Sequence, residues 1–300
     1  MILSVSRRTD IPGCYPEWFM NRLREKYVMT RNPMNFHQVS QINLSPDFIE
    51  CIVFWTKNAV PFMDYLDELN SMGYMYMFQY TITSYDNTLE KNIPDKSVII
   101  KNVLELSEKI GKKRIVWRYD PILLNDTYTI NRHINLFEEM CSLLNTAVNH
   151  VVISFIDLYQ KNRRYKLYEL STDEIIYLAK AFGEIGRKYK LTIKTCCENY
   201  DLTKFGITEG ACIDSALLEE ICNRPLLLKR ATGQRKNCLC AESVDIGAYH
   251  TCLNGCIYCY ATDYKRLKTK QKSYDHNSQI LCDKLDLEKD IIKVRKIKKL

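Results

Sequence analysis

Three cysteines near the C-terminal end of the chain, Cys252, Cys256 and Cys259, have the spacing C-x3-C-x2-C. Three thiolates can hold three irons of a 4Fe–4S cluster, and the fourth iron then stays open to a small molecule. An aromatic residue, Tyr258, stands immediately before the third cysteine, where it can lie against a cluster. The spacing therefore predicts a 4Fe–4S cluster with one reactive iron.

Zinc is the alternative occupant of this loop, because His250 could complete a tetrahedron with the three thiolates. Two details favour iron. The ligands are crowded into one short loop without the distant second ligand pair of a zinc ribbon, and Tyr258 occupies the position next to the third cysteine. With either occupant, this stretch is predicted to be a metal site.

A second group of five cysteines precedes this loop. Four thiolates would close a site completely, which suits an electron relay or a structural anchor, and either a second 4Fe–4S cluster or zinc fits such a ligand set. We expect Cys196, Cys212, Cys238 and Cys240 to be the ligands, and the spacing leaves Cys197 open as a substitute for Cys196. The remaining cysteines are expected to be ordinary scattered thiols, namely Cys14, Cys51, Cys141, Cys222 and Cys282.

The composition bounds the class of protein. A length of 300 residues with 46% hydrophobic content allows one large α/β domain or two small ones. No run of eighteen apolar residues occurs, and the opening segment soon meets Arg7 and Arg8, so we expect neither a membrane span nor a signal peptide. We therefore expect a cytoplasmic protein, in which thirteen cysteines favour metal ligation over disulfides.

The net charge of +7 is concentrated at one end of the chain. Residues 264–300 hold twelve Lys and Arg against five Asp and Glu, whereas residues 1–263 hold 31 of each. The lysine-rich stretch 293–299 is weak evidence for a polyanion, because such ends are usually solvated. A nucleic-acid partner is therefore only weakly supported, and no membrane partner is expected.

Six short segments rich in β-branched and aromatic residues alternate with helical patterns; they begin near Ile2, Cys51, Tyr74, Arg114, His150 and Leu191. This alternation predicts a parallel sheet, and the first segment lacks the glycine-rich turn of a dinucleotide fold. We therefore predict an α/β protein with a partial TIM-like (β/α)6 barrel at 1–200. A cysteine-rich iron–sulfur segment at 201–263 would pack on the barrel rim, followed by a basic tail at 264–300. Residues 27–44 break the rhythm and are expected to form an extra hairpin.

Polar residues follow these segments at the predicted C-terminal strand ends, where barrels of this kind carry out their chemistry. Part of this set is expected only to satisfy loop amides. For Arg8, Lys57, Arg118 and Asp120 together, we expect a charged cavity that contacts polar groups of a substrate or cofactor.

Nearly the whole chain resembles the uncharacterised prokaryotic domain-of-unknown-function family DUF1848, whose C-terminal cysteines are similar to those of radical S-adenosylmethionine proteins. The resemblance implies an iron–sulfur protein without an assigned reaction. It rests on Ser6-Arg7-Arg8-Thr9-Asp10-Ile11-Pro12, Phe54-Trp55-Thr56-Lys57-Asn58, Trp117-Arg118-Tyr119-Asp120-Pro121-Ile122, Ile153-Ser154-Phe155-Ile156-Asp157-Leu158-Tyr159 and Ser243-Val244-Asp245-Ile246-Gly247-Ala248-Tyr249.

The loop 255–261 is also similar to the cluster loop of spore photoproduct lyase and its relatives, radical enzymes that repair a thymine dimer in DNA. Only this loop and, loosely, residues 118–121 carry that likeness. Here the loop follows all six predicted strands instead of the first, so the barrel would be permuted or the C-terminal part would fold back over its rim. No Gly-Gly-Glu follows the second strand to hold the amino group of S-adenosylmethionine, and Thr56, Lys57 and Asn58 stand there instead.

The leading hypothesis is a radical S-adenosylmethionine enzyme that generates a 5′-deoxyadenosyl radical for an unknown substrate, with ferredoxin or flavodoxin as electron donor. A second hypothesis is a barrel that binds a ligand or nucleic acid and whose zinc or iron–sulfur sites are purely structural. A third is a hydrolase whose metal is held by Asp10, Asp120 and Asp157.

Overall fold

The computed structural model describes residues 1–235 and 237–295, without the side chains of residues 161, 163 and 164, and it shows an α/β protein built on one parallel sheet. The sheet has eight strands in the order β10-β1-β4-β5-β6-β7-β8-β9, and every neighbouring pair is parallel. The strands are β1 (Ile2–Val5), β4 (Cys51–Thr56), β5 (Tyr76–Thr81), β6 (Ile115–Ile122), β7 (His150–Phe155), β8 (Thr192–Cys196), β9 (Thr208–Gly210) and β10 (Ser243–Asp245).

The six strands predicted from the sequence are confirmed, and β9 and β10 extend the sheet by one strand at each edge. The two edge strands have three residues each. A segment of that length is too short to show the two-residue alternation that identifies a strand, which explains why sequence patterning gave six strands instead of eight.

Helices connect consecutive strands, and local capping explains where several of them begin and end. The Ser171 and Glu174 side chains form the capping box at the start of α6, and α4 ends at Gly111, whose φ is +84°. In the described part of the chain, no helix combines the length and apolar character needed to cross a bilayer. The α-helices are α1 (Ile11–Cys14), α2 (Pro16–Glu25), α3 (Leu66–Ser71), α4 (Lys96–Ile110), α5 (Ile130–Leu144), α6 (Thr172–Tyr189), α7 (Ser215–Cys222) and α8 (Tyr264–Gln271). The 3-10 helices are η1 (Pro46–Phe48), η2 (Val60–Tyr65), η3 (Lys112–Arg114), η4 (Gln160–Tyr165) and η5 (Thr203–Phe205).

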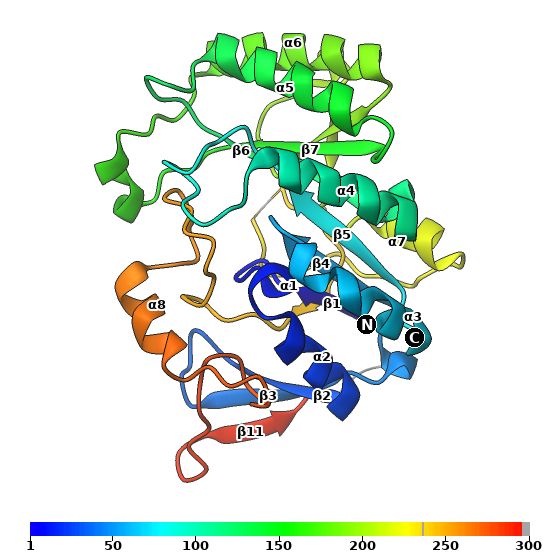
Figure 1. Cartoon of the computed structure of the whole chain (residues 1–300), viewed down its shortest axis with the longest axis vertical. Helices are drawn as coiled ribbons and strands as arrows, with labels where there is room; N and C mark the ends of the chain where they lie inside the picture. Colours follow the sequence, from blue (N-terminus) through cyan, green and yellow to red (C-terminus); the bar gives the residue numbers. More distant parts are fainter. Residues whose placement is uncertain (236, 296–300) are drawn as a thin grey trace.

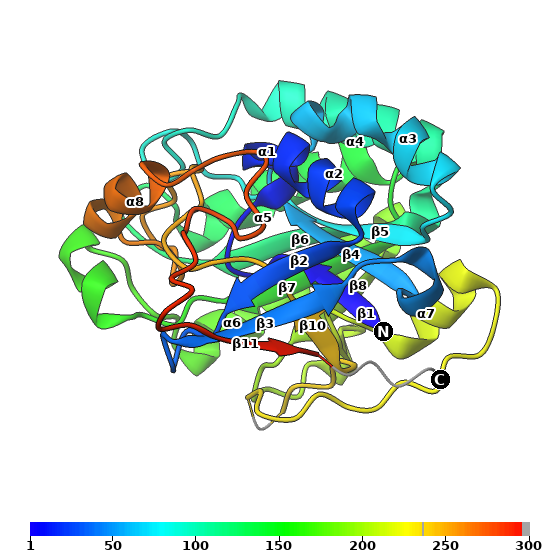
Figure 2. The same cartoon turned by 90° about the horizontal axis from the view of Figure 1, so that it is seen from below.

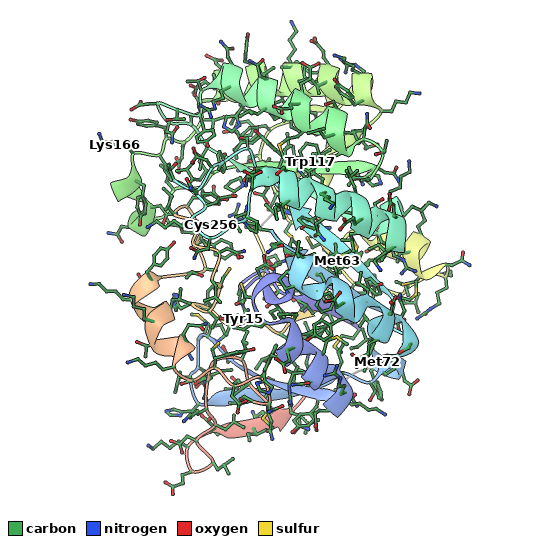
Figure 3. All side chains as sticks on the ribbon, viewed as in Figure 1. Tyr15, Met63, Met72, Trp117, Lys166 and Cys256 are labelled. Carbon is green, nitrogen blue, oxygen red and sulfur yellow. The ribbon has the colours of Figure 1, made fainter. Side chains whose placement is uncertain are left out.

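The two faces of the sheet bury different partners. Figure 2 shows α2, α3 and α4 on one side and the segment that leads from α7 to β10 on the other. The helix side forms the large core, to which the sheet contributes residues such as Phe54, Phe78 and Trp117, the last of which is labelled in Figure 3. The opposite side forms a smaller core in which alternate strand residues such as Val53 and Met77 pack with α7.

The sheet is strongly curved toward the smaller core. The Gln79 side chain on β5 donates a hydrogen bond of 2.7 Å to the Cys212 carbonyl, which follows β9. Three strands lie between β5 and β9, so the two ends of this bond would be about 19 Å apart in a flat sheet. The Ala241 N–H also donates to the Ile213 carbonyl at 2.9 Å, which links the segment after β9 to the segment before β10. Curvature therefore brings the two edges of the sheet toward each other.

A second sheet lies at the far end of the molecule from α5 and α6 (Figure 1). The predicted hairpin at 27–44 is confirmed as the antiparallel pair β2 (Tyr27–Arg31) and β3 (Gln38–Asn43), and β11 (Ile291–Val294) adds to β3 in parallel. Arg31 fixes the returning chain through ion pairs of 2.8 Å to Asp283 and 2.6 Å to Asp290. Residues 264–295 therefore pack on the body, while 296–299 of the predicted polyanion-binding stretch lie outside the described residues.

Candidate metal and cofactor site

The predicted cluster loop at 252–259 lies at the C-terminal edge of the sheet and is held there by Asp10. The buried Asp10 carboxylate accepts hydrogen bonds from the Asn254 side chain at 2.8 Å, from the Lys57 N–H at 2.7 Å and from the Gly13 N–H at 2.9 Å. One carboxylate thus joins the loop to the end of β4 and to α1. Burial raises the pKa of Asp10, although these donors oppose the shift.

The segment after β5 forms a second support of the loop. Glu90 and Cys256 pair as an antiparallel β-bridge, and the Ile257 N–H donates to the Leu89 carbonyl at 3.0 Å. Gly255 has a φ of +74°, and a Cβ there would lie 3.1 Å from the Asn92 amide nitrogen. Only a glycine meets both demands without strain.

Glu90 is a buried carboxylate with four side-chain partners. Its carboxylate pairs with Lys57 at 2.8 Å and Lys96 at 2.6 Å, and accepts hydrogen bonds from Thr83 at 2.6 Å and from the Tyr258 hydroxyl. Burial alone would raise the pKa of Glu90, but the two ammonium groups outweigh it and hold this pKa at about 2. The Tyr258 of the cysteine loop is therefore tied to an ionised carboxylate.

Lys57 stands between Glu90 and the cysteine loop. Burial lowers the pKa of Lys57, but the Glu90 carboxylate and then the Cys256 sulfur raise it above its ordinary value, so the ammonium stays charged. Its Nζ atom lies 5.7 Å from the centre of the Tyr258 ring. The loop therefore has a fixed positive charge close to one of its predicted ligands.

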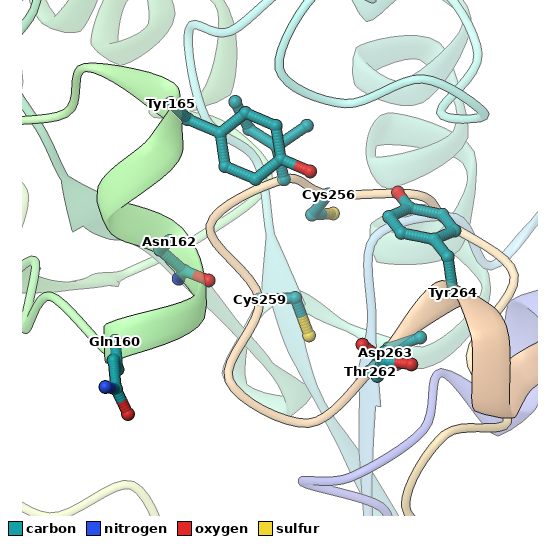
Figure 4. Close-up of a pocket in the computed structure, with 9 residues that line it drawn as sticks. Gln160, Asn162, Tyr165, Cys256, Cys259, Thr262, Asp263 and Tyr264 are labelled. Atoms are coloured by element: carbon teal, nitrogen blue, oxygen red, sulfur yellow. The ribbon is translucent and has the colours of Figure 1, made fainter.

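The three loop cysteines line one small cavity, together with Asn254, Gly255, Thr262 and Tyr264. A larger hollow of about 250 Å³ adjoins it, since Cys256, Cys259, Thr262 and Tyr264 line both. Figure 4 shows Asn162 and Gln160 of η4 on one side of the Cys259 sulfur and Thr262 and Asp263 on the other. Figure 3 places Cys256 on the same loop, between the segment that carries Lys166 and α8. The cysteine loop is thus the wall of a polar hollow.

A fourth thiol, Cys14, lies at the C-terminal end of α1 beside the loop. It is close enough to hydrogen-bond with Cys252, and this contact is the largest influence that raises the pKa of the Cys252 thiol, ahead of burial. The Cys14 sulfur also contacts the Asn254 side-chain oxygen at 3.7 Å. The sequence spacing grouped Cys14 with the scattered thiols, because 238 positions of chain separate it from Cys252 and only the fold brings the two together.

His250, the predicted fourth ligand of a zinc site, has other partners. Its Nδ1 atom accepts a hydrogen bond from the Asp263 N–H at 3.0 Å, and its Nε2 atom lies 3.4 Å from an Arg266 guanidinium nitrogen. A set of four zinc ligands in this loop would therefore be completed more directly by Cys14 than by His250.

The second group of cysteines gathers where the two sheet edges approach each other. The Cys196 and Cys212 sulfurs are 2.6 Å apart, and Cys240 hydrogen-bonds to Cys212. Burial raises the pKa of Cys197, and the charge of Cys238 adds to this effect. The structure thus brings Cys196, Cys212 and Cys240 into direct contact, with Cys197 and Cys238 within reach of each other's charge.

Arg118 and Asp120 lie on β6 between the two cysteine groups. The Arg118 guanidinium contacts the Cys212 sulfur at 3.1 Å and lies 5.3 Å from the Trp55 ring centre. Its Nε and Nη2 atoms both donate to one Asp120 carboxylate oxygen. Asp120 also accepts a hydrogen bond from Ser154. Burial raises the pKa of the neighbouring Glu198 to about 7, and the Asp120 charge adds to the effect. The predicted rim residues Arg118 and Asp120 thus bind each other within the protein.

Arg8 lies at the same edge of the sheet, half-buried, with its guanidinium 5.1 Å from the Tyr249 ring centre and 3.4 Å from the Gly247 carbonyl. The three carboxylates of the hydrolase hypothesis have separate partners. Asp10 is occupied by N–H donors, Asp120 by Arg118, and Asp157, which is 58% exposed, by Arg235 at 2.6 Å. The geometry gives that hypothesis no support.

Comparison with known proteins places the chain in a family. The model of DUF1848, described as a domain of unknown function, matches residues 2–261. The chain belongs to the DUF1848 family. The match covers every strand of the large sheet and the whole cysteine loop, whereas α8 and β11 lie beyond it.

Other comparisons add no function to this DUF1848 chain. No curated protein matches it. A solved structure from Bacteroides thetaiotaomicron VPI-5482, named as a "putative alpha-L-fucosidase", has 12% sequence identity and a TM-score of 0.23, with 58% of this chain and 84% of that chain covered. That similarity is too low to support an argument.

Sequence reasoning on this DUF1848 chain missed two features of the site. Neither Glu90 nor Cys14 belongs to a local sequence motif. Each becomes part of the site only through contacts with residues far away in the chain. Within residues 1–235 and 237–295, no group of three or more His, Cys, Asp and Glu side chains has the arrangement of a preformed metal site. The identity of any metal therefore rests on the chemistry of the thiol sets.

Proposed function

We propose that this protein is a radical S-adenosylmethionine-type iron–sulfur enzyme whose 4Fe–4S cluster is held by Cys252, Cys256 and Cys259. One observation carries the proposal: the three cysteines line one cavity that opens on a polar hollow of about 250 Å³. A three-thiolate loop beside an open space is what a cluster with one accessible iron requires. With one electron added, such a cluster supplies the reductive cleavage of S-adenosylmethionine to methionine and a 5′-deoxyadenosyl radical.

We further infer that the curved sheet is a partial barrel of the TIM type. Helices cover one face, and the contact between Gln79 and Cys212 shows how far the sheet bends. In such folds the chemistry takes place at the C-terminal ends of the strands. The cysteine loop lies at that edge, although it follows the strands in the chain, because Asp10 and the Glu90 segment hold it there.

The role of Lys57 in this proposal is electrostatic. A fixed ammonium near Cys256 stabilises the more negative, reduced form of an anionic thiolate centre. Glu90 holds Lys57 in position and keeps it charged. An external one-electron donor of the ferredoxin or flavodoxin kind would be required.

The hollow offers the polar groups that an amino-acid and ribose moiety needs. Thr56 and Asn58, which stand where radical S-adenosylmethionine enzymes carry Gly-Gly-Glu, are used by their own turn, because Thr56 accepts from the Asn58 N–H at 2.9 Å and Asn58 from the Val60 N–H at 3.1 Å. Gln160 and Asp263 line the hollow instead and can contact an ammonium or hydroxyl group.

Cys14 supports a second candidate function. If its thiolate joined the three loop cysteines, the site would be fully ligated and would have no open iron, as in a structural zinc site or an electron-transfer cluster. The protein would then be a ligand- or nucleic-acid-binding domain whose metals only stabilise the fold.

An electron paramagnetic resonance experiment separates the two. Protein purified without oxygen and reduced with dithionite is expected to show a 4Fe–4S signal that changes when S-adenosylmethionine is added. The Cys256→Ala variant should lose the part of the signal that responds to S-adenosylmethionine and all 5′-deoxyadenosine formation. Cys141→Ala, which removes a buried thiol from the helix core, should keep both. A reduced cluster that is insensitive to S-adenosylmethionine would favour the second candidate, and zinc without iron would rule out the first.

A further inference from the structure

The cysteine group at the approaching sheet edges has a geometry of its own. Cys196 ends β8, Cys212 follows β9, and Cys240 precedes β10, so three separate segments each bring one thiol to the same place. The Cys196 and Cys212 sulfurs are 2.6 Å apart, and Cys212 also hydrogen-bonds to Cys240. Cys212 and Cys240 are 5% and 3% exposed. We call this group, with Cys197 and Cys238, the seam cysteines.

A fourth ligand is available within the same group. Cys197 lies close enough to both Cys238 and Cys212 for their charges to act on it. Cys238 stands two residues before Cys240 on the same segment, where the Cys238 N–H donates to the Arg235 carbonyl at 2.9 Å. Three thiols are therefore in direct contact, and Cys197 and Cys238 are the candidates for the fourth ligand of a closed thiolate site.

Two arginines place positive charge near these thiols. The Arg118 guanidinium lies 3.1 Å from the Cys212 sulfur. Arg7 acts on Cys212 and Cys240 from the end of β1, with its guanidinium 5.1 Å from the Trp55 ring centre. Hydrogen bonds and cations around the sulfurs are how proteins stabilise anionic thiolate centres.

We propose that the seam cysteines bind a thiophilic metal centre, zinc or an iron–sulfur cluster, through Cys196, Cys212, Cys240 and one of Cys197 and Cys238. This centre is separate from the cysteine loop and does not depend on the proposed function. Each thiol releases its proton to solvent as it binds, and no electron transfer is needed for assembly. The metal joins β8 to the segments beside both edge strands, so it stabilises the curvature that brings the two edges of the sheet together. Arg118 is then a positioning residue of this centre.

Metal analysis of four proteins purified without oxygen tests the proposal. Cys212→Ala is expected to hold one metal centre fewer per chain than the wild type. If the loop cysteines also bind a centre, the wild type holds two and the double variant with Cys256→Ala should lose both. Cys141→Ala is the matched control, because it removes a buried thiol that is not among the seam or loop cysteines, and it should retain the wild-type metal content. Zinc without visible absorption and iron with equimolar sulfide both support the proposal and identify the metal.

A second measurement covers the case in which Cys212→Ala does not fold. In a variant with all three loop cysteines changed to alanine, Co²⁺ added to protein stripped of metal should give the intense visible bands of a tetrahedral thiolate site. Wild-type metal content in a folded Cys212→Ala variant would overturn the proposal, as would an absence of cobalt–thiolate bands. A Cys196–Cys212 disulfide in protein purified without oxidant would also overturn it. Failure of the proposed function, in contrast, would leave the cobalt bands unchanged.

Discussion

The two cysteine groups of this protein differ in how exposed their surroundings are. The loop cysteines come from one short segment and line a cavity beside a polar hollow. The seam cysteines come from three segments, and Cys212 and Cys240 are buried in the smaller core with Arg118 against Cys212. If each group binds a metal as we propose, the first arrangement gives a small molecule access to it, whereas the second excludes small molecules.

The supports differ as much as the thiols do. The loop is held by buried charged and polar groups, above all Asp10 and the Glu90 ion pairs. The seam is held by the sheet itself through the Gln79 and Ala241 hydrogen bonds. A reactive site on a loop, as we propose for the loop cysteines, needs side chains that hold the loop in place. A structural site within a sheet is positioned by the sheet itself.

The largest effect on this comparison should come from Glu90→Gln. Removal of the carboxylate leaves Lys57 and Lys96 without their partner in a buried place, so the free energy of unfolding should fall by about 3 kcal/mol in urea titrations. The matched control is Glu68→Gln, whose partner Arg24 is 42% exposed, and it should cost about 0.5 kcal/mol. Equal losses for the two variants would show that the Glu90 group is not the anchor of the loop.

Arg118→Met, at the seam cysteines, should lower the free energy of unfolding somewhat less than Glu90→Gln does. Asp120 keeps its bond from Ser154 but loses its charged partner, so we expect the free energy of unfolding to fall by about 2 kcal/mol, together with weaker metal retention against a chelator. Arg24→Met serves as the control for the loss of an arginine ion pair at the surface. If Arg118→Met retained metal as the wild type does, its assignment to the seam would be wrong.

The pH dependence of stability tests whether Glu90 supports the loop as an ionised carboxylate. The folded pKa of Glu90 is about 2 against an ordinary value of 4.5, so its contribution is fully present above pH 4.5 and is lost as the pH falls toward 2. The difference in unfolding free energy between the wild type and Glu90→Gln should therefore shrink as the pH falls from 4.5 to 2. A difference that stays constant over this range would contradict an ionised Glu90.

The smallest effect is expected from Cys14→Ala. If the loop cluster has an open iron, Cys14 is a neighbour and not a ligand, and the variant should keep its iron content and change 5′-deoxyadenosine formation by about twofold or less, which corresponds to about 0.4 kcal/mol. Loss of the cluster in this variant would instead show that the loop site is closed by four thiolates, and the contrast between the two groups would disappear.

Several parts of this molecule were predictable from local patterns. Strands such as β4 and β7 carry continuous runs of β-branched and aromatic residues, and the Ser171 capping box marks the beginning of α6. The loop cysteines were predictable as a set because they are neighbours in the chain. The edge strands β9 and β10 were not, since three residues carry no period.

The sequence by itself determined the parallel α/β architecture and a crowded thiol loop, because both follow from residue types and short spacings. Only the tertiary structure decided that Glu90 and Cys14 stand beside that loop and that Arg118 faces Cys212. These contacts join residues that are from 94 positions apart, for Arg118 and Cys212, to 238 positions apart, for Cys14 and Cys252. No local pattern encodes such pairs, since they depend on how the parallel strands bring their C-terminal ends to one edge and how the curved sheet brings its own edges together.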